Sequence, residues 1–469
     1  MSDPFSMLDP ALQFARNNQQ ANLARLCDWL RIPSISTLPQ YAGDVRRAAQ
    51  FASNYLKEMG MTFVEIRETS GHPLVFATWS GSERTSPTLL IYGHFDVQPT
   101  DPDHEWTRPP FEPIVEEGNL YARGASDDKG QAMAVLAALE SYLKTSGRLP
   151  VHVKVLLEGE EEVTSTNLFS YLREHAEELR ADAILIADQD MLDPKHPVLM
   201  WGVRGNLYLE IEVRGPSHDL HSGTYGGSVD NPLNVLVRLL SNLQDGGTQK
   251  ILIPHFYDEV EELTEAERDL ISRAPINDQI GLHLTGAPAL GGEAGYPLAE
   301  RVSVRPTLEI HGIAGGFIGE GMKTVIPSKA TAKVSMRLVP HQDPEEILDS
   351  LQLYMKSLCP ATVTMNIRVL GKAHPVKIDF KSSAVQAAAV AYERGFGHRP
   401  VYLRGGGSLP IVHEMIKELS KPDHAIPVVM IGFGLPDDHT HSPNEKFSIS
   451  NFHQGIETVI HYLDLFKSL

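Results

Sequence analysis

The chain has 469 residues, and its Asp and Glu residues outnumber its Lys and Arg residues by 60 to 41, for a formal net charge of −19. This balance argues against nucleic-acid binding and against docking on anionic lipid, because both need a basic surface. The two cysteines, Cys27 and Cys359, exclude a disulfide framework and a cysteine-rich metal site. A bound metal would therefore depend on histidine and carboxylate ligands.

The N-terminal segment MSDPFSMLDPALQF has neither a basic n-region nor an apolar core, so we expect no secretory signal. The long apolar runs, such as 426–435, fall short of the ~20 residues that a membrane-spanning helix needs. We therefore expect a cytoplasmic enzyme without a membrane partner.

The first part of the chain alternates helical and strand patterns. Apolar residues recur at helical spacing in three segments, 10–31, 44–59 and 130–143. Short β-rich runs occur at 62–66, 74–79, 88–92, 151–157 and 183–187. Strands that alternate with helices predict an α/β catalytic domain, with a mostly parallel sheet and helices on both of its faces.

The pattern changes near Gly205. Apolar and polar residues alternate over 206–214, which is typical of a half-exposed strand in an antiparallel sheet. Similar strands are predicted at 330–339 and 363–369, with helices at 231–242 and 344–357. The pattern predicts an inserted α+β domain over 206–377, an antiparallel sheet with two helices, between catalytic segments 1–205 and 378–469.

Residues with ligating or proton-transferring side chains follow several of the predicted strands. They are His94 and Asp96, Glu158 to Glu162, Asp188, and Asp437 to Glu445, while Asp127 and Asp128 precede the helix at 130–143. Each has an ordinary explanation on its own: a buried histidine, a helix N-cap or a solvated loop. Because open α/β sheets place their sites at the carboxyl ends of the strands, the combination favours one shared site.

Five of these residues suit a metal centre: His94, Asp127, Glu162, Asp188 and His441. Two imidazoles and three carboxylates without a thiolate fit hard to borderline cations, zinc first, with manganese or cobalt as alternatives. Five ligands are too many for one tetrahedral ion. They suffice for two divalent ions when one carboxylate bridges them.

Several segments carry a resemblance to a known family. They are YGHFDVQP, RGASDDKG, LLEGEEE, RGPSHDLHSGTYGG, KTVIPSKATAKVSMRLVP, RGGGSLPIV and HTHSPNEK. Together they resemble the di-zinc peptidases and amidohydrolases that include carnosine dipeptidases, glutamate-releasing carboxypeptidases, aminoacylases and succinyl-diaminopimelate desuccinylases. HSGTYGG, MRLVP and HSPNEK are most similar to the carnosine-dipeptidase branch.

The resemblance implies roles at the metal centre. By it, His94, Asp127 and Asp188 would bind one zinc ion, and Asp127, Glu162 and His441 would bind the other, with Asp127 as the bridge. Glu161 would be the general base, and Asp96 would orient His94. The peptide bond between Asp127 and Asp128 would be cis.

The resemblance also implies roles in the inserted domain. His221 would reach the active site of the partner subunit and stabilise the oxyanion, which makes a homodimer part of the mechanism. Arg337 would bind the terminal carboxylate of the substrate, with Thr324 and Ser408 as companions. The ordinary readings are a solvated loop for His218 and His221 and a solvated strand face for Arg337.

The function that the resemblance implies is hydrolysis of a peptide bond next to a free carboxylate, through a bridging metal-bound water that Glu161 activates. This describes a dipeptidase acting on a small peptide. The alternative on the same scaffold is an N-acyl amino-acid deacylase. A non-catalytic metal- or peptide-binding protein would lack a ligand or the base, and this chain has them all. Ala122 and Thr164 stand where the family commonly has glycine, which bears on specificity.

Overall fold

The computed structural model describes residues 7–81 and 85–469. Residues 1–6, the first part of the segment 1–14 in which we predicted no secretory signal, lie outside the described residues. The chain forms two compact units. Unit 1 comprises Met1–Trp201, Ile378–Tyr402 and Glu414–Leu469, and unit 2 comprises Gly202–Lys377 and Leu403–His413.

Unit 2 differs from the predicted insert at residues 206–377 in two respects. It begins at Gly202, and it also contains Leu403–His413, which the sequence assigned to the second catalytic segment. Side-chain hydrogen bonds hold this short segment: Arg204 Nε donates to the carbonyl of Gly406 at 3.1 Å, and Arg337 Nη1 donates to Ser408 Oγ at 3.0 Å. Such long-range contacts leave no periodic signal in the sequence.

The main sheet of unit 1 has a parallel centre. In spatial order its strands are β1 (Phe63–Arg67), β2 (Leu74–Trp79), β6 (His152–Glu158), β3 (Thr88–His94), β7 (Ala183–Ala187), β17 (Val428–Ile431) and β8 (Val198–Val203). The four strands from β6 to β17 run parallel, and the flanking strands run antiparallel. The short strands β15 (Val376–Lys377) and β16 (Val401–Gly405) pair with β8.

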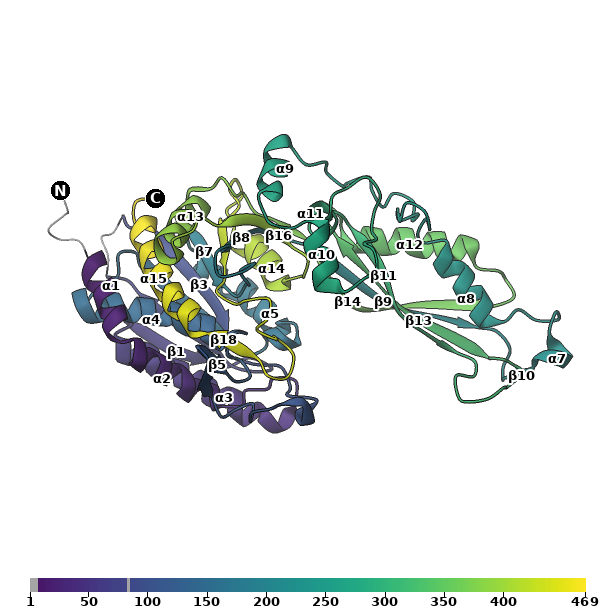
Figure 1. The fold of residues 1–469 in the computed structure, drawn as a ribbon, viewed down its shortest axis with the longest axis horizontal. Coiled ribbons are helices and arrows are strands. Elements are labelled where there is room, and N and C mark those ends of the chain that lie inside the picture. The colour runs from purple at the N-terminus through teal and green to yellow at the C-terminus, as the bar shows by residue number, and fades with distance from the viewer. Residues whose placement is uncertain (1–6, 82–84) are drawn as a thin grey trace. The chain divides into compact units, whose positions relative to one another are not determined.

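Helices cover this sheet (Figure 1). They are α1 (Leu8–Asn17), α2 (Gln19–Leu30), α3 (Ala42–Met59), α4 (Lys129–Ser146), α5 (Thr166–Glu174), α6 (Ala176–Leu179), α13 (Ser383–Phe396), α14 (Pro410–Leu419) and α15 (Ile449–Phe466). Helix α3 buries its apolar stripe against β1 and β2, and α4, which packs on β3 and β7, is buried along most of its length. The prediction of a single helix over 10–31 is wrong. The backbone leaves the helical region at Asn18, whose side-chain amide donates a hydrogen bond to the carbonyl of Phe14.

Unit 1 also contains a small three-stranded sheet. Strand β18 (Lys446–Ser448) pairs with β5 (Asn119–Tyr121), which pairs with β4 (Ile114–Glu116). Lys446 lies opposite Tyr121 in this register. The small sheet therefore brings the chain just after His441 next to the chain just before Arg123.

Unit 2 is built on an antiparallel sheet. Its strands, in spatial order, are β11 (Thr307–Gly315), β13 (Lys329–Leu338), β9 (Gly205–Arg214) and β14 (Thr364–Ala373). Its shorter elements are β10 (Leu220–His221), α7 (Ser222–Tyr225), α9 (Glu265–Ser272), α10 (Asp278–Thr285), α11 (Leu298–Arg301) and β12 (Val325–Ile326).

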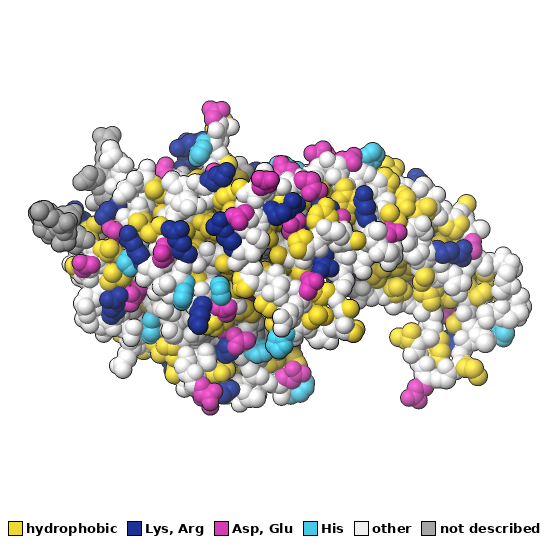
Figure 2. All heavy atoms as spheres, turned by 45° about the horizontal axis from the view of Figure 1, so that its top comes forward, with side chains coloured by type: hydrophobic (Ala, Val, Ile, Leu, Met, Phe, Trp, Pro, Cys, Tyr) yellow, Lys and Arg dark blue, Asp and Glu magenta, His cyan; other side chains and the backbone are white. Residues whose placement is uncertain are grey.

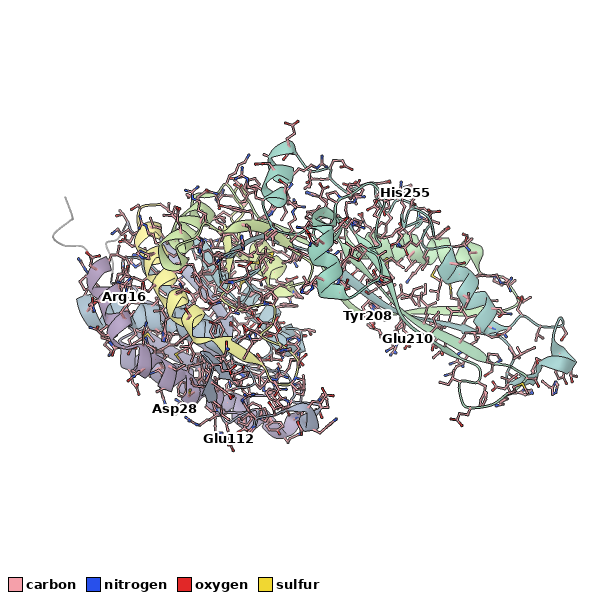
Figure 3. All side chains as sticks on the ribbon, in the orientation of Figure 1. Arg16, Asp28, Glu112, Tyr208, Glu210 and His255 are labelled. Carbon is pink, nitrogen blue, oxygen red and sulfur yellow. The ribbon has the colours of Figure 1, made fainter. Side chains whose placement is uncertain are left out.

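Two helices of unit 2, α8 (Pro232–Ser241) and α12 (Pro344–Leu358), pack on one face of its sheet through a shared apolar core. Side chains of β9 alternate, so that Leu207 and Leu209 join this core while Tyr208 and Glu210 project from the other face (Figure 3). The predicted fold class, a mainly parallel α/β domain with an inserted antiparallel sheet and two helices, is confirmed.

The described surface carries charges of both signs. On the face that Figure 2 shows, acidic and basic side chains are interspersed among apolar ones. Among the described residues, no helix combines the length and apolar character needed to cross a bilayer.

Candidate active site

The residues predicted to bind metal gather at one edge of the main sheet. Strand β3 ends at His94, and Asp188 directly follows β7. Beyond β6 the chain turns into a short 3-10 helix, Glu161–Val163, which carries Glu162. Because β6, β3 and β7 are parallel neighbours, their carboxyl ends meet at this edge, as expected for an open α/β sheet.

Two groups of potential ligands share Asp127. His94 Nε2 lies 3.1 Å from Asp127 Oδ1 and 3.9 Å from Asp188 Oδ2. His441 Nε2 lies 2.8 Å from Asp127 Oδ2 and 3.4 Å from Glu162 Oε2. The ligating atoms within each group all lie within 4.8 Å of one another. Asp127 therefore turns one oxygen toward each histidine.

Both groups fit divalent cations by their chemistry. His94 is buried, and its Nε2 makes no hydrogen bond with any described residue although carboxylate oxygens surround it. His94 Nδ1 donates to the backbone carbonyl of Asp96 at 3.1 Å, which leaves the Nε2 lone pair free for a metal. A buried imidazole nitrogen facing carboxylates is a suitable ligand set for zinc or a similar ion.

The carboxyl groups at this edge compete for protons. Burial raises the pKa of Glu161 to about 7 and also raises the pKa of Glu162 and of Asp188. Hydrogen bonds that His441 donates to the carboxylates of Asp127 and Glu162 raise the pKa of His441 to about 10. Burial works against ionisation of Asp127 too, but the neighbouring imidazoles of His441 and His94 hold its pKa below the ordinary value. Cations would replace the protons that now offset this crowded negative charge.

Asp96 holds the segment that carries Glu161 and Glu162. Its carboxylate is completely buried and accepts hydrogen bonds from the backbone N–H of Glu161 at 3.2 Å and of Glu162 at 3.1 Å. Its link to His94 runs mainly through the backbone carbonyl, since the closest carboxylate oxygen lies 3.4 Å from His94 Nδ1. Glu161 belongs to neither ligand group, so its carboxyl group is left for another task.

The other predicted site residues, His221, Thr324, Arg337 and Ser408, belong to unit 2. His221 is exposed on β10, and the backbone N–H of Ser222 donates to the carbonyl of Thr324 at 3.1 Å. Arg337, on β13, donates to Ser408. The Cys27 and Cys359 thiols are free, so neither forms a disulfide.

Three buried acidic residues support the site although sequence reasoning gave them no role: Asp128, Asp438 and Glu445. Asp128 accepts a hydrogen bond from the backbone N–H of His94, and Asp438 accepts one from Ser126 Oγ, both at 3.0 Å. All three lie within four residues of a predicted ligand, which is the signal that could have found them. The peptide bond between Asp127 and Asp128 is cis, as the resemblance implied.

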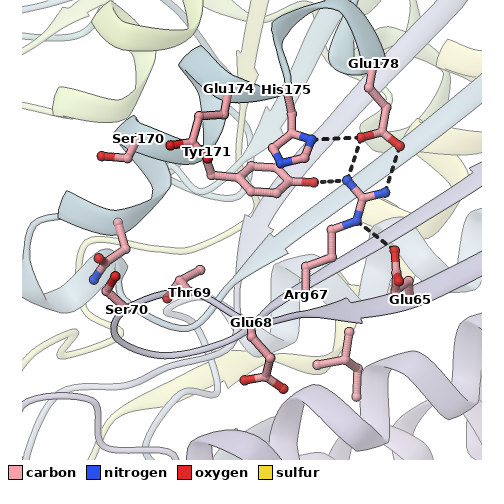
Figure 4. Close-up of a pocket in the computed structure, with 12 residues that line it drawn as sticks. Glu65, Arg67, Glu68, Thr69, Ser70, Ser170, Tyr171, Glu174, His175 and Glu178 are labelled. Atoms are coloured by element: carbon pink, nitrogen blue, oxygen red, sulfur yellow. Dashed lines mark hydrogen bonds and ion pairs between the residues drawn. The ribbon is translucent and has the colours of Figure 1, made fainter.

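A separate cavity of about 880 Å³ lies beside β1 and α5 (Figure 4). Arg67 there binds Glu178 through two hydrogen bonds of 2.6 and 2.7 Å, and it also donates to Glu65 and Tyr171. Its charge is thus already balanced. The described lining of this cavity includes none of the predicted site residues.

Comparison with known proteins agrees with the resemblance. The model of peptidase family M20/M25/M40 matches residues 90–465. The Cys-Gly metallodipeptidase dug1 of Schizosaccharomyces pombe is 32% identical, over 97% of this chain and 98% of that protein. A metallo-carboxypeptidase from Sulfolobus solfataricus has a similar structure, with a TM-score of 0.83 and 32% identity over 96% of this chain and 99% of that one.

Human carnosine dipeptidase 1 has a TM-score of 0.82 and 28% identity, with both chains covered completely. This similarity supports the predicted likeness to the carnosine-dipeptidase branch. The family model spans all seven segments on which the resemblance rests, and the matches extend over almost the whole chain. The chain therefore belongs to peptidase family M20/M25/M40.

Proposed function

We propose that this chain is a metal-dependent dipeptidase that hydrolyses the peptide bond next to a free carboxylate. One observation carries the proposal: Asp127 turns Oδ1 toward His94 and Oδ2 toward His441, at 3.1 and 2.8 Å. In a member of this peptidase family, two ligand groups with a shared carboxylate suit a pair of neighbouring cations. Dipeptides are the substrate class because the similar proteins include a Cys-Gly metallodipeptidase and carnosine dipeptidase 1.

His94, Asp127 and Asp188 would hold one ion, and Asp127, Glu162 and His441 the other. Nitrogen and carboxylate ligands favour zinc, with manganese or cobalt as alternatives. When bound, the ions would polarise the scissile carbonyl and lower the pKa of a water molecule.

Glu161 is the proposed general base. With its pKa at about 7, its carboxyl group can accept a proton from the attacking water and then release it near neutral pH. The proton then passes from the Glu161 carboxyl to the amine nitrogen of the leaving group. Asp96 keeps Glu161 in place through the backbone hydrogen bond.

Unit 2 would recognise the substrate. Arg337 presents a planar guanidinium suited to a terminal carboxylate, and Ser408 lies 3.0 Å from it. Thr324 would complete this contact. His221, exposed on β10, would donate a hydrogen bond to the developing oxyanion in the other subunit of a homodimer, which makes unit 2 a lid and dimerisation domain.

The test is hydrolysis by metal-free protein reloaded with zinc, manganese or cobalt. Cys-Gly and β-Ala-His would be compared with their C-terminal amides and with N-acetyl amino acids. We expect metal-dependent cleavage of the free dipeptides and at least about tenfold slower cleavage of the amides, since a lost charged contact of ~1.4 kcal/mol changes a rate tenfold. Cleavage of the N-acyl substrates alone would assign a deacylase instead.

A further inference from the structure

The carboxylate of Glu445 joins two chain segments that carry candidate metal ligands, one with Asp127 and the other with His441. Glu445 lies four residues after His441 in the chain, and its side chain is completely buried. Both of its oxygens accept hydrogen bonds from a single segment, 123–127, which ends at the shared ligand Asp127. The donors are Arg123 Nη1 at 2.7 Å, the backbone N–H of Gly124 at 3.0 Å, of Ser126 at 2.9 Å and of Asp127 at 3.1 Å.

These contacts form a fixed frame around Asp127. The guanidinium of Arg123 is as deeply buried as the carboxylate it meets, so the ion pair is shielded from water. The backbone N–H of Ala122 donates to the carbonyl of Glu445 at 3.1 Å, which continues the pairing of β18 with β5. The side chain and the main chain of Glu445 therefore hold the same segment.

We propose that Glu445 is a positioning residue for the metal centre, which orients Asp127 toward both ligand groups and keeps His441 in register with it. This inference rests on the proposed function. Glu445 accepts a hydrogen bond from the backbone N–H of Asp127 and so fixes the backbone of this ligand. The two carboxylate oxygens of Asp127 must face different ions. The same residue is joined to His441 by a short stretch of chain, so a displacement of Glu445 would disturb Asp127 and His441, two of the three ligands of the second group.

The test is the affinity for metal of the full-length Glu445→Gln variant. Glutamine keeps the shape of the side chain, but its amide N–H₂ group would face N–H donors and it carries no charge for Arg123. Because loss of an outer contact to a ligand costs about 10- to 100-fold in metal affinity, we expect zinc to bind more weakly by that factor. Competition with a chromogenic chelator measures the affinity, and the visible absorption of bound cobalt reports the ligand geometry.

Glu140→Gln is the matched control. Glu140, on α4 in the same unit, is also a buried carboxylate that accepts hydrogen bonds from Arg25 and Tyr55, both at 2.9 Å. We expect this variant to lose thermal stability yet bind zinc and cobalt as the wild type does. Equal weakening of metal binding in both variants would show a general structural effect and overturn the proposal.

If Glu445→Gln does not fold, Glu445→Asp keeps the charge but shortens the side chain, and it should bind zinc more weakly with an altered cobalt spectrum. Wild-type affinity and an unchanged cobalt spectrum in a folded Glu445 variant would refute the positioning role. Wild-type protein that binds no metal would instead overturn the proposed function, and the inference with it.

Discussion

The carboxylate of Asp96 accepts a hydrogen bond from the backbone N–H of Glu161 at 3.2 Å. Its second oxygen binds the next N–H along, that of Glu162, so one buried carboxylate fixes the backbone of two neighbouring residues. The two glutamates can then take different directions. Glu162 reaches the ligand group of His441, while Glu161 stays outside both groups. Glu162 is therefore placed to bind metal, and Glu161 is left to transfer a proton.

Glu161→Gln should bind two equivalents of metal but lose at least about 100-fold in kcat, because the amide cannot take a proton from water. The kcat and the metal content are measured on the same preparation. Glu160→Gln is the control, because the Glu160 carboxylate is directed to Asn167, at 2.8 and 3.0 Å. Full turnover by the Glu161 variant would exclude it as the base.

Asp127→Asn and Asp188→Asn should differ in metal content. Asp127 contributes to both ligand groups and Asp188 to one of them. Elemental analysis should therefore find both ions depleted in the Asp127 variant but only one in the Asp188 variant. If the two variants retain the same number of ions, Asp127 is not the bridge.

His221→Ala should lose about 100-fold or more in kcat, the usual effect of removing an oxyanion donor, with metal content unchanged. The neighbouring exposed residue provides the control, His218→Ala. Mixed dimers of the His221→Ala and Glu161→Gln chains test where the side chain acts. Partial recovery of activity on mixing is expected if His221 serves the partner subunit, and two variants that stay inactive together would argue for action within one chain.

Arg337→Lys should raise KM for free dipeptides by about tenfold and leave the slow cleavage of dipeptide amides unchanged, since lysine cannot bind a carboxylate through two parallel hydrogen bonds. Steady-state kinetics on the matched acid and amide measure the effect. Lys333→Arg, an exposed change on the same strand that also keeps the charge, is the control. An equal effect of Arg337→Lys on both substrates would remove the terminal carboxylate as its partner.

Removal of metal should make stability depend on pH. The folded-state pKa of Glu161 is about 7, above its ordinary value of 4.5, so the folded protein retains a proton that the unfolded chain releases. The resulting stability is complete below the ordinary pKa and is lost as the pH rises through about 7. His441, with a pKa of about 10, acts in the same direction toward higher pH. The Tm of metal-free protein should fall between pH 5 and 8.

Zinc-loaded protein provides the comparison. Bound cations would take the place of the shared protons, so the Tm of the loaded protein should change less over the same range. Thermal unfolding of both forms in the same buffers measures this. A Tm of the metal-free form that rises from pH 5 to 8 would contradict the assignment of the raised carboxyl pKa values.

Local sequence was sufficient to predict the fold class and the five candidate ligands. Apolar periodicity and the chemistry of strand ends are local properties, and parallel strands necessarily gather their carboxyl ends at one edge. The break at Asn18 escaped prediction, since α1 and α2 have nearly continuous helical periodicity and differ in the helices they contact: α1 packs on α4 and α15.

Other features depended on packing between distant parts of the chain. Arg123 and Glu445 are separated by 322 positions, and the pairing of β18 with β5 brings their chain segments together. Side-chain geometry likewise decides that Asp127 faces two histidines and that Asp96 binds the backbone N–H of Glu161. Residue type shows which groups can bind a metal or carry a proton, but the close packing of the folded chain decides which oxygen meets which donor.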